Sequence, residues 1–362
     1  MGLGSIAAIV VERALEPVEG MHRAIARSWV RPLGAEQGPA ARLHANSLGL
    51  VYGSIRLGVA AAGIGLDLAT STDSDRFAPA TAVVNGLWGD DLGRHTESLG
   101  LDMSLRHMHG ARITTDELRR CFPDATSRVV ILVHGFAQTE TCWGSTEDER
   151  GLHDVLDDDP LTTPILVRYN TGAGVDESGE ELARLVEGLV AAWPVDVEAV
   201  SLIGYSMGGL VGRRAVEFGF QEAHGWVDRM ADLIVVATPH DGTPIEKFVN
   251  LASHGFRRFS STEPLSQFLE GRSRGIKDMR HGPQASASRP DHVKLHVIGG
   301  AVTGNPRHPL GIAAGDLVVR ESSARAQPGD HASNTLMVGS VTHVSLLRSR
   351  ETIDAIVGFL GI

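Results

Sequence analysis

The spacing of apolar and polar residues follows two different patterns along the chain, and the second pattern begins at Arg128. Up to residue 80 the apolar positions recur at helical spacing, as at Met21, Ile25 and Trp29, so this segment is expected to be helical. From Arg128 onward, short apolar runs alternate with amphipathic stretches, which predicts alternating strands and helices and a mostly parallel sheet. The predicted strands cover 129–133, 165–168, 200–203, 233–237, 293–298 and 335–338.

The clearest helix between these strands is predicted over 179–193. Leu182, Leu185 and Leu189 fall on one face of it, and Pro194 ends it. The fold class expected from this alternation is α/β, with a mostly parallel central sheet and helices on both faces.

The elements outside this alternation suggest how the chain is divided. Residues 81–90 and 101–106 are predicted to form short strands or hairpin pieces ahead of the main sheet. The segment 241–290 interrupts the alternation after a strand, where a cap or lid over a pocket could be inserted; ordinary connecting helices are the alternative. We therefore expect a helical N-terminal segment over 1–80 and an α/β domain over 81–362, with the insertion at 241–290.

Composition excludes several classes of function. The formal net charge is −11 and the chain has no long basic tract, which argues against binding nucleic acid. Its two cysteines, Cys121 and Cys142, form neither a disulfide framework nor a C-x-x-C motif; whether they pair with each other is open. The histidines lack H-E-x-x-H spacing. No metal or organic cofactor is expected.

Two apolar stretches near the N-terminus bear on where in the cell the protein is expected. Residues 1–11 have no basic residues before them, and Glu12 and Arg13 follow, so we expect the start of a helix and not a signal peptide. Residues 48–69 are apolar but contain Arg56, which favours a packed helix over a membrane span. A cytoplasmic protein is therefore expected; for residues 48–69, peripheral membrane contact is the alternative to a packed helix.

The stretch 199–210 carries the strongest chemical signal. An apolar run leads into Gly204-Tyr-Ser-Met-Gly208, and apolar residues at helical spacing follow. Strand, G-x-S-x-G and helix together make up the context of a nucleophile elbow, which exposes a serine at the carboxyl end of a sheet. The alternative is an ordinary glycine-rich turn with a capping serine. Ser206 is the candidate nucleophile, and it needs a base beside it and donors for the oxyanion that it creates.

The base and the acid are expected after Ser206, in the order acid and then histidine. His343 follows the last predicted strand and is the candidate base; its competitors are His292, His308 and His331. The candidate acid is Asp316, which stands between Gly315 and an apolar run in the region after the preceding strand. Its task would be to orient the imidazole and stabilise the imidazolium. Asp291 comes too early in the chain, and Asp330 lies in a Pro-Gly turn.

Two backbone N–H groups are candidates for the oxyanion hole. One belongs to Met207, the residue after the nucleophile. The other belongs to Phe136, because Gly135 lets the chain bend away from the strand over 129–133.

Several stretches together resemble α/β-hydrolase-fold serine lipases and esterases, in a bacterial branch related to GPI-inositol-deacylase-like hydrolases. The likeness runs from about residue 80 to the end, and the N-terminal helical segment is also similar to that branch. The matching stretches are 132–136, 168–172, 202–211, 237–244, 275–282, Gly315-Asp316 and His343. Tyr205 departs from the pattern, since such lipases usually have His there; its side chain is expected to point away from the reacting group. His240, in the Thr-Pro-His stretch, is expected to be structural.

The resemblance implies Ser206 as nucleophile, Asp316 as acid, His343 as base, and Phe136 and Met207 as oxyanion donors. It implies an enzyme that cleaves carboxylic esters through an acyl-enzyme, acting on a small-molecule ester or a lipid-like substrate. Two alternatives remain. The same residues could serve an acyltransferase or thioesterase, or the fold could be a catalytically idle lipid-binding module. Acyl chain length, head group, oligomeric state and any lid motion are left open.

Overall fold

The computed structural model describes most of the chain from residue 102 onward. The chain forms two compact units, Met1–Val84 and Asn85–Ile362. The helical segment predicted for 1–80 lies outside the described residues, so it and the domain boundary stay predictions. The described residues are 102–108, 110–242, 273–281, 289–305 and 331–362, with Ala82, Gly86, His308, Gly315, Asp316, Val319 and Ser323.

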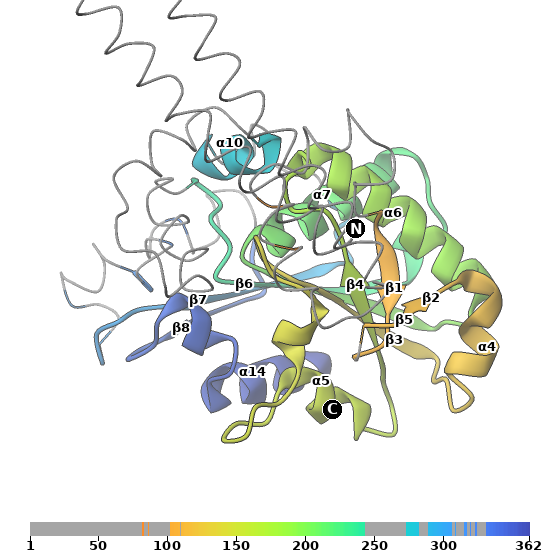
Figure 1. Ribbon diagram of the computed structural model, residues 1–362, viewed down its shortest axis with the longest axis horizontal. Helices are drawn as coiled ribbons and strands as arrows, with labels where there is room; N and C mark the ends of the chain where they lie inside the picture. The colour runs from red at the N-terminus through yellow and green to blue at the C-terminus, as the bar shows by residue number, and fades with distance from the viewer. Residues whose placement is uncertain are drawn as a thin grey trace, which may run out of the picture. The chain divides into compact units, whose positions relative to one another are not determined.

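An eight-stranded sheet runs through the second unit, in the order β2-β1-β4-β3-β5-β6-β7-β8 (Figure 1). β1 pairs antiparallel with β2 and β4, and the other pairs are parallel. The strands are β1 (Ser104–Arg106), β2 (Arg112–Ile113), β3 (Arg128–Val133), β4 (Thr163–Arg168), β5 (Ala199–Tyr205), β6 (Met230–Val236), β7 (Lys294–Gly300) and β8 (Asn334–Val338).

Each apolar run predicted as a parallel strand coincides with one of the strands from β3 to β8, within a few residues. The runs are continuous because the central strands are buried on both faces: every residue of β4 is buried, as are all but the first of β3 and β5. Residues 101–106 contain β1. The prediction of a strand over 81–90 is wrong at its two described positions, Ala82 and Gly86, which are helical.

Helices cover both faces of the sheet. α6 (Val175–Ala192) and α7 (Met207–Gln221) lie on one face, and α5 (Leu152–Asp157) and α14 (Arg350–Leu360) lie on the other (Figure 1). α6 matches the predicted helix over 179–193 but begins one turn earlier. Among the described residues, the shorter helices are η3 (Thr115–Glu117), α4 (Leu118–Cys121), η4 (Glu140–Trp143), η5 (Val227–Arg229), α10 (Arg274–His281) and α13 (His343–Leu346).

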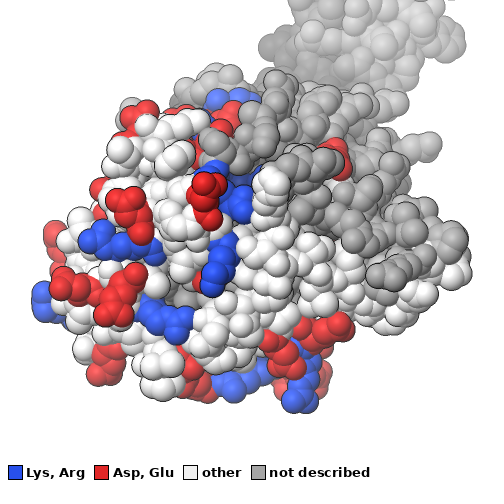
Figure 2. All heavy atoms as spheres, turned by 180° about the vertical axis from the view of Figure 1, so that it is seen from behind, with Lys and Arg blue, Asp and Glu red and all other residues white. Residues whose placement is uncertain are grey.

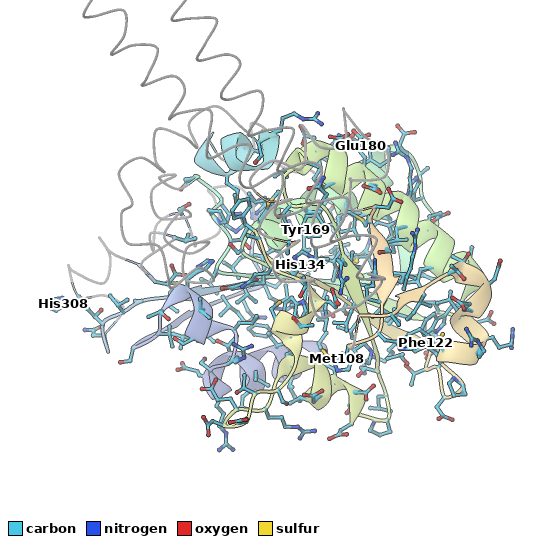
Figure 3. The ribbon with its side chains drawn as sticks, viewed as in Figure 1. Met108, Phe122, His134, Tyr169, Glu180 and His308 are labelled. Carbon is cyan, nitrogen blue, oxygen red and sulfur yellow. The ribbon has the colours of Figure 1, made fainter. Side chains whose placement is uncertain are left out.

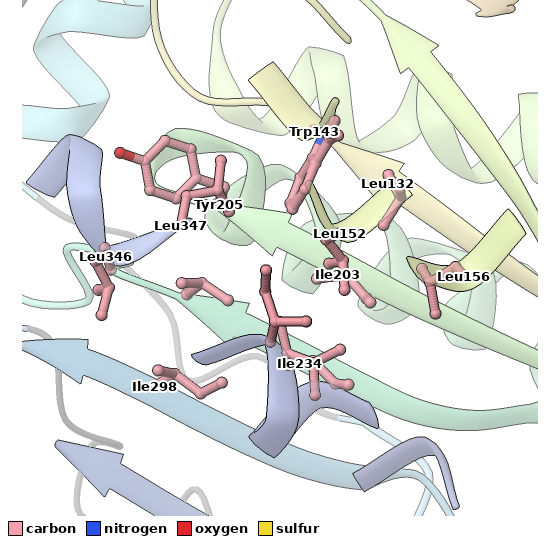
Figure 4. Packing of buried hydrophobic residues seen from close by; sticks show 14 of the residues in the cluster. Leu132, Trp143, Leu152, Leu156, Ile203, Tyr205, Ile234, Ile298, Leu346 and Leu347 are labelled. Carbon is pink, nitrogen blue, oxygen red and sulfur yellow. The ribbon is translucent and has the colours of Figure 1, made fainter. Parts of the chain in front are cut away.

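A large hydrophobic cluster fills the space between the sheet and the helices α5 and α14 (Figure 4). Ile203, Ile234 and Ile298 contribute from neighbouring strands, while Trp143 and Leu346 contribute from η4 and α13. The two short helices that follow β3 and β8 are therefore packed into one core. This packing matters for the site, because the loops after those two strands carry its candidate residues.

The strand order, the parallel register from β4 to β8 and the helices on both faces make this an α/β-hydrolase fold. On the described atoms of the face in Figure 2, acidic and basic side chains are interspersed, and no large basic area is visible there. None of the described helices is long and apolar enough to cross a membrane.

Candidate active site

Ser206 occupies the sharp turn between β5 and α7. Its backbone has φ 54° and ψ −122°, a conformation that is strained for a residue with a side chain. The turn is held on both sides: the Ser206 N–H donates to the Val236 carbonyl at 2.8 Å, and its carbonyl accepts from the Gly209 N–H at 3.0 Å. The strain is thus imposed by the surrounding backbone, as a nucleophile elbow requires.

The glycines of the elbow allow its backbone segments to approach closely. A Cβ at Gly204 would lie 2.5 Å from the carbonyl oxygen of Gly208, and a Cβ at Gly208 would lie 2.2 Å from the carbonyl oxygen of Val133. Real Cβ atoms do not come so near to a carbonyl oxygen, so both positions need glycine. This close packing brings the first turn of α7 against the carboxyl end of β3.

His343 and Asp316 lie beside Ser206 in one hydrogen-bonded line. The Nε2 of His343 is 3.0 Å from the Oγ of Ser206, and its Nδ1 is 2.7 Å from Oδ2 of Asp316. All three residues are at most 1% exposed. A carboxylate can only accept a hydrogen bond, so Nδ1 carries the proton and Nε2 is left to accept from the serine hydroxyl. Nε2 of His343 is therefore in position to accept the proton of the Ser206 hydroxyl.

The backbone fixes the carboxylate and the imidazole together. The His343 N–H donates to the Asp316 carbonyl at 2.8 Å, and the Val319 N–H donates to Oδ1 of Asp316 at 2.7 Å. Gly315 precedes the carboxylate with φ 58°, which glycine adopts without strain. Thr342 caps the helix that begins at His343. Both side chains are thus oriented by backbone contacts as well as by each other.

The competing candidates lie elsewhere. His292 hydrogen-bonds the Val227 carbonyl through Nε2 at 3.1 Å, while His308 and His331 are exposed. Asp291 is exposed at the start of the turn before β7, and Asp330 lies outside the described residues. Of the candidates for acid and base, the structure brings Asp316 and His343 together with Ser206.

The predicted oxyanion loop follows β3 and approaches the elbow. A Cβ at Gly135 would lie 3.1 Å from the Cβ of Ser206, which shows how near this loop is to the serine. Phe136 is 3% exposed, and Ala137 after it has φ 55°. Met207 begins α7, where the first N–H groups have no acceptor within the helix. Both predicted donors thus belong to backbone next to Ser206.

The segment after β4 holds the predicted oxyanion loop in place, which the sequence did not reveal. The Ala137 N–H donates to Oγ1 of Thr171 at 3.1 Å, and the Tyr169 hydroxyl donates to the His134 carbonyl at 3.0 Å. The rings of His134 and Tyr169 stack with centroids 4.6 Å apart. Figure 3 labels the two residues. The only sequence signal was that both segments belong to stretches shared with the resembled family.

His134 is a buried neutral histidine. Its Nδ1 lies 2.9 Å from the Gly135 carbonyl, to which it donates, and its Nε2 accepts from the Tyr169 N–H at 3.4 Å. Burial lowers the pKa of His134 to about 4, because the charged form would lose its hydration. The ring therefore stays uncharged near neutral pH and serves as a fixed link between the two segments.

A buried ion pair continues this link beyond the loop. Arg168, at the end of β4, donates through Nε to Oε2 of Glu140 at 2.7 Å, and through Nη2 to the other carboxylate oxygen. Glu140 is 0% exposed and Arg168 is 7% exposed. Since a buried charge must be paired, this bidentate contact ties the start of η4 to β4.

α10 lies against the first turn of α6 and near Met207. Oδ2 of Asp278 accepts from the Val175 N–H at 2.8 Å, and the Gly275 N–H donates to the Gly172 carbonyl at 3.2 Å. A Cβ at Gly275 would come within 3.0 Å of Cε of Met207. Most of the rest of 241–290 lies outside the described residues, so the cap or lid stays a prediction.

His240, Cys121 and Cys142 take no part in the hydrogen-bonded line. His240 is buried, and its ring Nδ1 lies 3.3 Å from Nη1 of Arg213. The backbone N–H of His240 donates to the Ser323 carbonyl. The two cysteines are not joined. Burial raises the pKa of the Cys142 thiol, so this residue does not compete as a thiolate nucleophile. Within the described part of the chain, no cluster of three or more potential ligands could hold a metal ion.

Comparison with known proteins gives one family match and several structural likenesses. Residues 123–282 match the family model described as "Putative serine esterase (DUF676)". This range contains Ser206, Phe136 and Met207, and it ends before Asp316 and His343. No curated protein sequence matches the chain.

The similar solved structures include two bacterial lipases and a thioesterase, each at low sequence identity. The mature lipase BlEst2 of Bacillus licheniformis is 18% identical, with a TM-score of 0.47 over 64% of this chain and 91% of that one. The Staphylococcus hyicus lipase is 15% identical, with a TM-score of 0.39 over 65% and 95%. The RedJ thioesterase of Streptomyces coelicolor is 14% identical, with a TM-score of 0.42 over 66% and 91%.

Proposed function

We propose that this protein is a serine hydrolase that cleaves carboxylic esters, with Ser206 as nucleophile, His343 as general base and Asp316 as the acid that orients it. The observation that carries the proposal is the buried line from Oγ of Ser206 through His343 to Asp316, with distances of 3.0 and 2.7 Å, on a strained elbow. The match of residues 123–282 to a serine esterase family supports it.

In the first half of the reaction, Nε2 of His343 takes the hydroxyl proton as Oγ of Ser206 attacks the ester carbonyl carbon. The carbonyl oxygen becomes an oxyanion, which the N–H groups of Phe136 and Met207 stabilise. The intermediate collapses, the carbon–oxygen bond to the alcohol breaks, and the alcohol leaves with the proton from His343. An acyl-enzyme on Ser206 remains.

In the second half, water replaces the alcohol. His343 takes a proton from the water as it attacks the acyl carbon, and a second oxyanion forms on the same two donors. Its collapse releases the carboxylic acid and returns the proton to Ser206. The line of three side chains is thereby restored, and the reaction consumes one ester and one water.

The substrate class that we propose is an acyl or lipid-like ester. This follows from the resemblance to lipases and esterases and from the apolar, glycine-rich stretches near the N-terminus. Contact with a membrane surface would suit such a substrate.

Turnover of p-nitrophenyl esters of increasing acyl length, compared between the wild type and Ser206→Ala, tests the proposal. We expect turnover by the wild type only, and covalent labelling by a fluorophosphonate at Ser206 only. The acyl length that gives the highest kcat/KM would separate esterase from lipase behaviour. A folded wild type that neither turns over any ester nor labels would contradict the proposal and favour a lipid-binding module.

Addition of alcohol or thiol acceptors to the same assay distinguishes hydrolysis from acyl transfer. If the protein is a hydrolase, the acid remains the main product when the acceptor is present. A predominance of the transfer product would assign the same three residues to an acyltransferase.

A further inference from the structure

Tyr205, the residue before Ser206, contacts the candidate base directly. Its hydroxyl donates to the main-chain carbonyl of His343 at 2.7 Å, across 138 positions of sequence. Its ring also lies against the imidazole, with centroids 5.1 Å apart and an angle of 35° between the planes. From the sequence alone Tyr205 had no expected role, because its side chain was expected to point away from the reacting group. In the structure this side chain reaches the residue that would take the serine proton.

The surroundings of Tyr205 hold it rigidly. The side chain is 0% exposed, and Trp143 meets it edge-on with ring centroids 6.4 Å apart. In Figure 4 the hydroxyl points toward the short helix that carries Leu346, the helix that His343 begins. Burial raises the pKa of Tyr205 well above its usual value, so the hydroxyl remains protonated and remains a donor.

This contact complements the two contacts already described. Asp316 contacts the imidazole ring at Nδ1 and Ser206 contacts it at Nε2, whereas the Tyr205 hydroxyl contacts the main chain of His343. Tyr205 is joined covalently to Ser206 and hydrogen-bonded to the His343 carbonyl. One side chain therefore spans the nucleophile's strand and the base's helix.

We propose that Tyr205 is a positioning residue that sets the distance between Oγ of Ser206 and Nε2 of His343. This inference rests on the proposed function, because the distance matters for catalysis only if His343 accepts the serine proton. Loss of this one hydrogen bond should lower the rate at which His343 withdraws the serine proton while leaving substrate binding intact. Proton transfer requires Oγ and Nε2 to lie within hydrogen-bond distance of each other.

The test is Tyr205→Phe, which removes only the hydroxyl. The matched control is Thr162→Val, which removes another buried hydroxyl that donates to a main-chain carbonyl, that of Leu156, ahead of β4 and outside the site. Both variants lose one buried hydrogen bond, so both should lose similar stability. Only Tyr205→Phe should change the chemistry.

We expect Tyr205→Phe to lower kcat for a p-nitrophenyl ester and the rate of fluorophosphonate labelling by about tenfold, with KM changed less than about twofold. Thr162→Val should retain wild-type kcat and labelling rate. A wild-type labelling rate in Tyr205→Phe would overturn the inference while leaving the proposed function intact. An unlabelled wild type would instead contradict the proposed function.

The imidazole proton on Nδ1 of His343 provides a second readout that needs no turnover. In the proton NMR spectrum of the wild type, this proton, held against Asp316, should resonate far downfield and exchange slowly with water. In Tyr205→Phe it should broaden through faster exchange, whereas in Thr162→Val it should not. An unchanged resonance in Tyr205→Phe would overturn the positioning role, whether or not the protein hydrolyses esters.

Discussion

At the residue scale, the proposed reaction gives each member of the hydrogen-bonded line one chemical task, and the surroundings of each side chain suit it to that task. Oδ2 of Asp316 faces the imidazole and Oδ1 accepts from the Val319 N–H, so the carboxylate is held as an acceptor. This arrangement keeps the proton of His343 on Nδ1. Substitutions that replace a single atom in one of these side chains should therefore change the rate of ester cleavage without changing the fold.

Asp316→Asn is expected to lower kcat by about 10⁴-fold with the fold intact, because the amide can donate to Nδ1 and favour the wrong tautomer of His343. Ester turnover and circular dichroism measure the two effects. Asp354→Asn, the same change at an exposed carboxylate of α14, serves as the control and should leave kcat unchanged. Near-normal turnover in Asp316→Asn would move the acid to another residue.

His134 should make folding stability depend on pH. Its pKa is about 4 in the folded state and near 6.5 when unfolded, so between these values the unfolded chain binds more protons. Stability from this group is therefore complete above pH 6.5 and is lost as the pH falls toward 4, by about 3 kcal/mol. Urea unfolding at pH 7 and pH 4 should show a smaller loss in His134→Gln than in the wild type.

At the element scale, the site depends on how closely the first turn of α7 approaches β3. Gly208 stands where the helix meets the Val133 and His134 carbonyls, and Gly135 stands where the next loop meets Ser206. The G-x-S-x-G pattern predicted the elbow because these packing demands act within a few residues. The links from Tyr169 to His134 and from Arg168 to Glu140 join separate elements, and no local pattern encodes such pairings.

Gly208→Ala is expected to destabilise the protein by about 3 kcal/mol, because the new methyl group would collide with main-chain oxygens that cannot move aside. Gly358→Ala is the matched control on α14, where nothing lies within 4 Å of the added carbon. There the better helix propensity of alanine should stabilise by about 1 kcal/mol. Chemical unfolding measures both changes, and equal effects would contradict the packing argument.

At the scale of the whole molecule, the sheet is joined by a second polar network that the proposed reaction does not use. His296 in β7 lies 3.0 Å from Oδ1 of Asp232 in β6, and the Ser201 hydroxyl in β5 donates to Oδ2 at 3.2 Å. Asn334 in β8 reaches Nδ1 of His296 at 2.9 Å, and the Phe359 ring of α14 stacks on the imidazole. The network joins four strands and a helix.

Asp232→Ala should therefore destabilise the fold by about 3 kcal/mol, because it leaves the buried ring N–H of His296 without its acceptor. The kcat and KM of the protein that remains folded should not change. Asp228→Ala, at an exposed aspartate of η5, should leave both stability and rate near the wild type. A large fall in kcat for Asp232→Ala would show that this network also supports the site.

The amino-acid sequence alone was enough to predict the fold class, the positions of the parallel strands and the elbow at Ser206. These features depend on the periodicity of buried residues and on glycines close to the serine, both of which can be read locally. It also indicated His343 and Asp316, since their order after the strands is dictated by the topology.

The side chains that hold these residues at hydrogen-bond distance could be identified only from the folded chain. Tyr205 and His343 are 138 positions apart, and their contact arises because β5 and α13 pack into the same core. The same holds for Thr171 and Ala137, and for the buried pair of Glu140 and Arg168. Such contacts depend on the register between strands and on the space left by neighbouring side chains, which a linear pattern of residues does not contain.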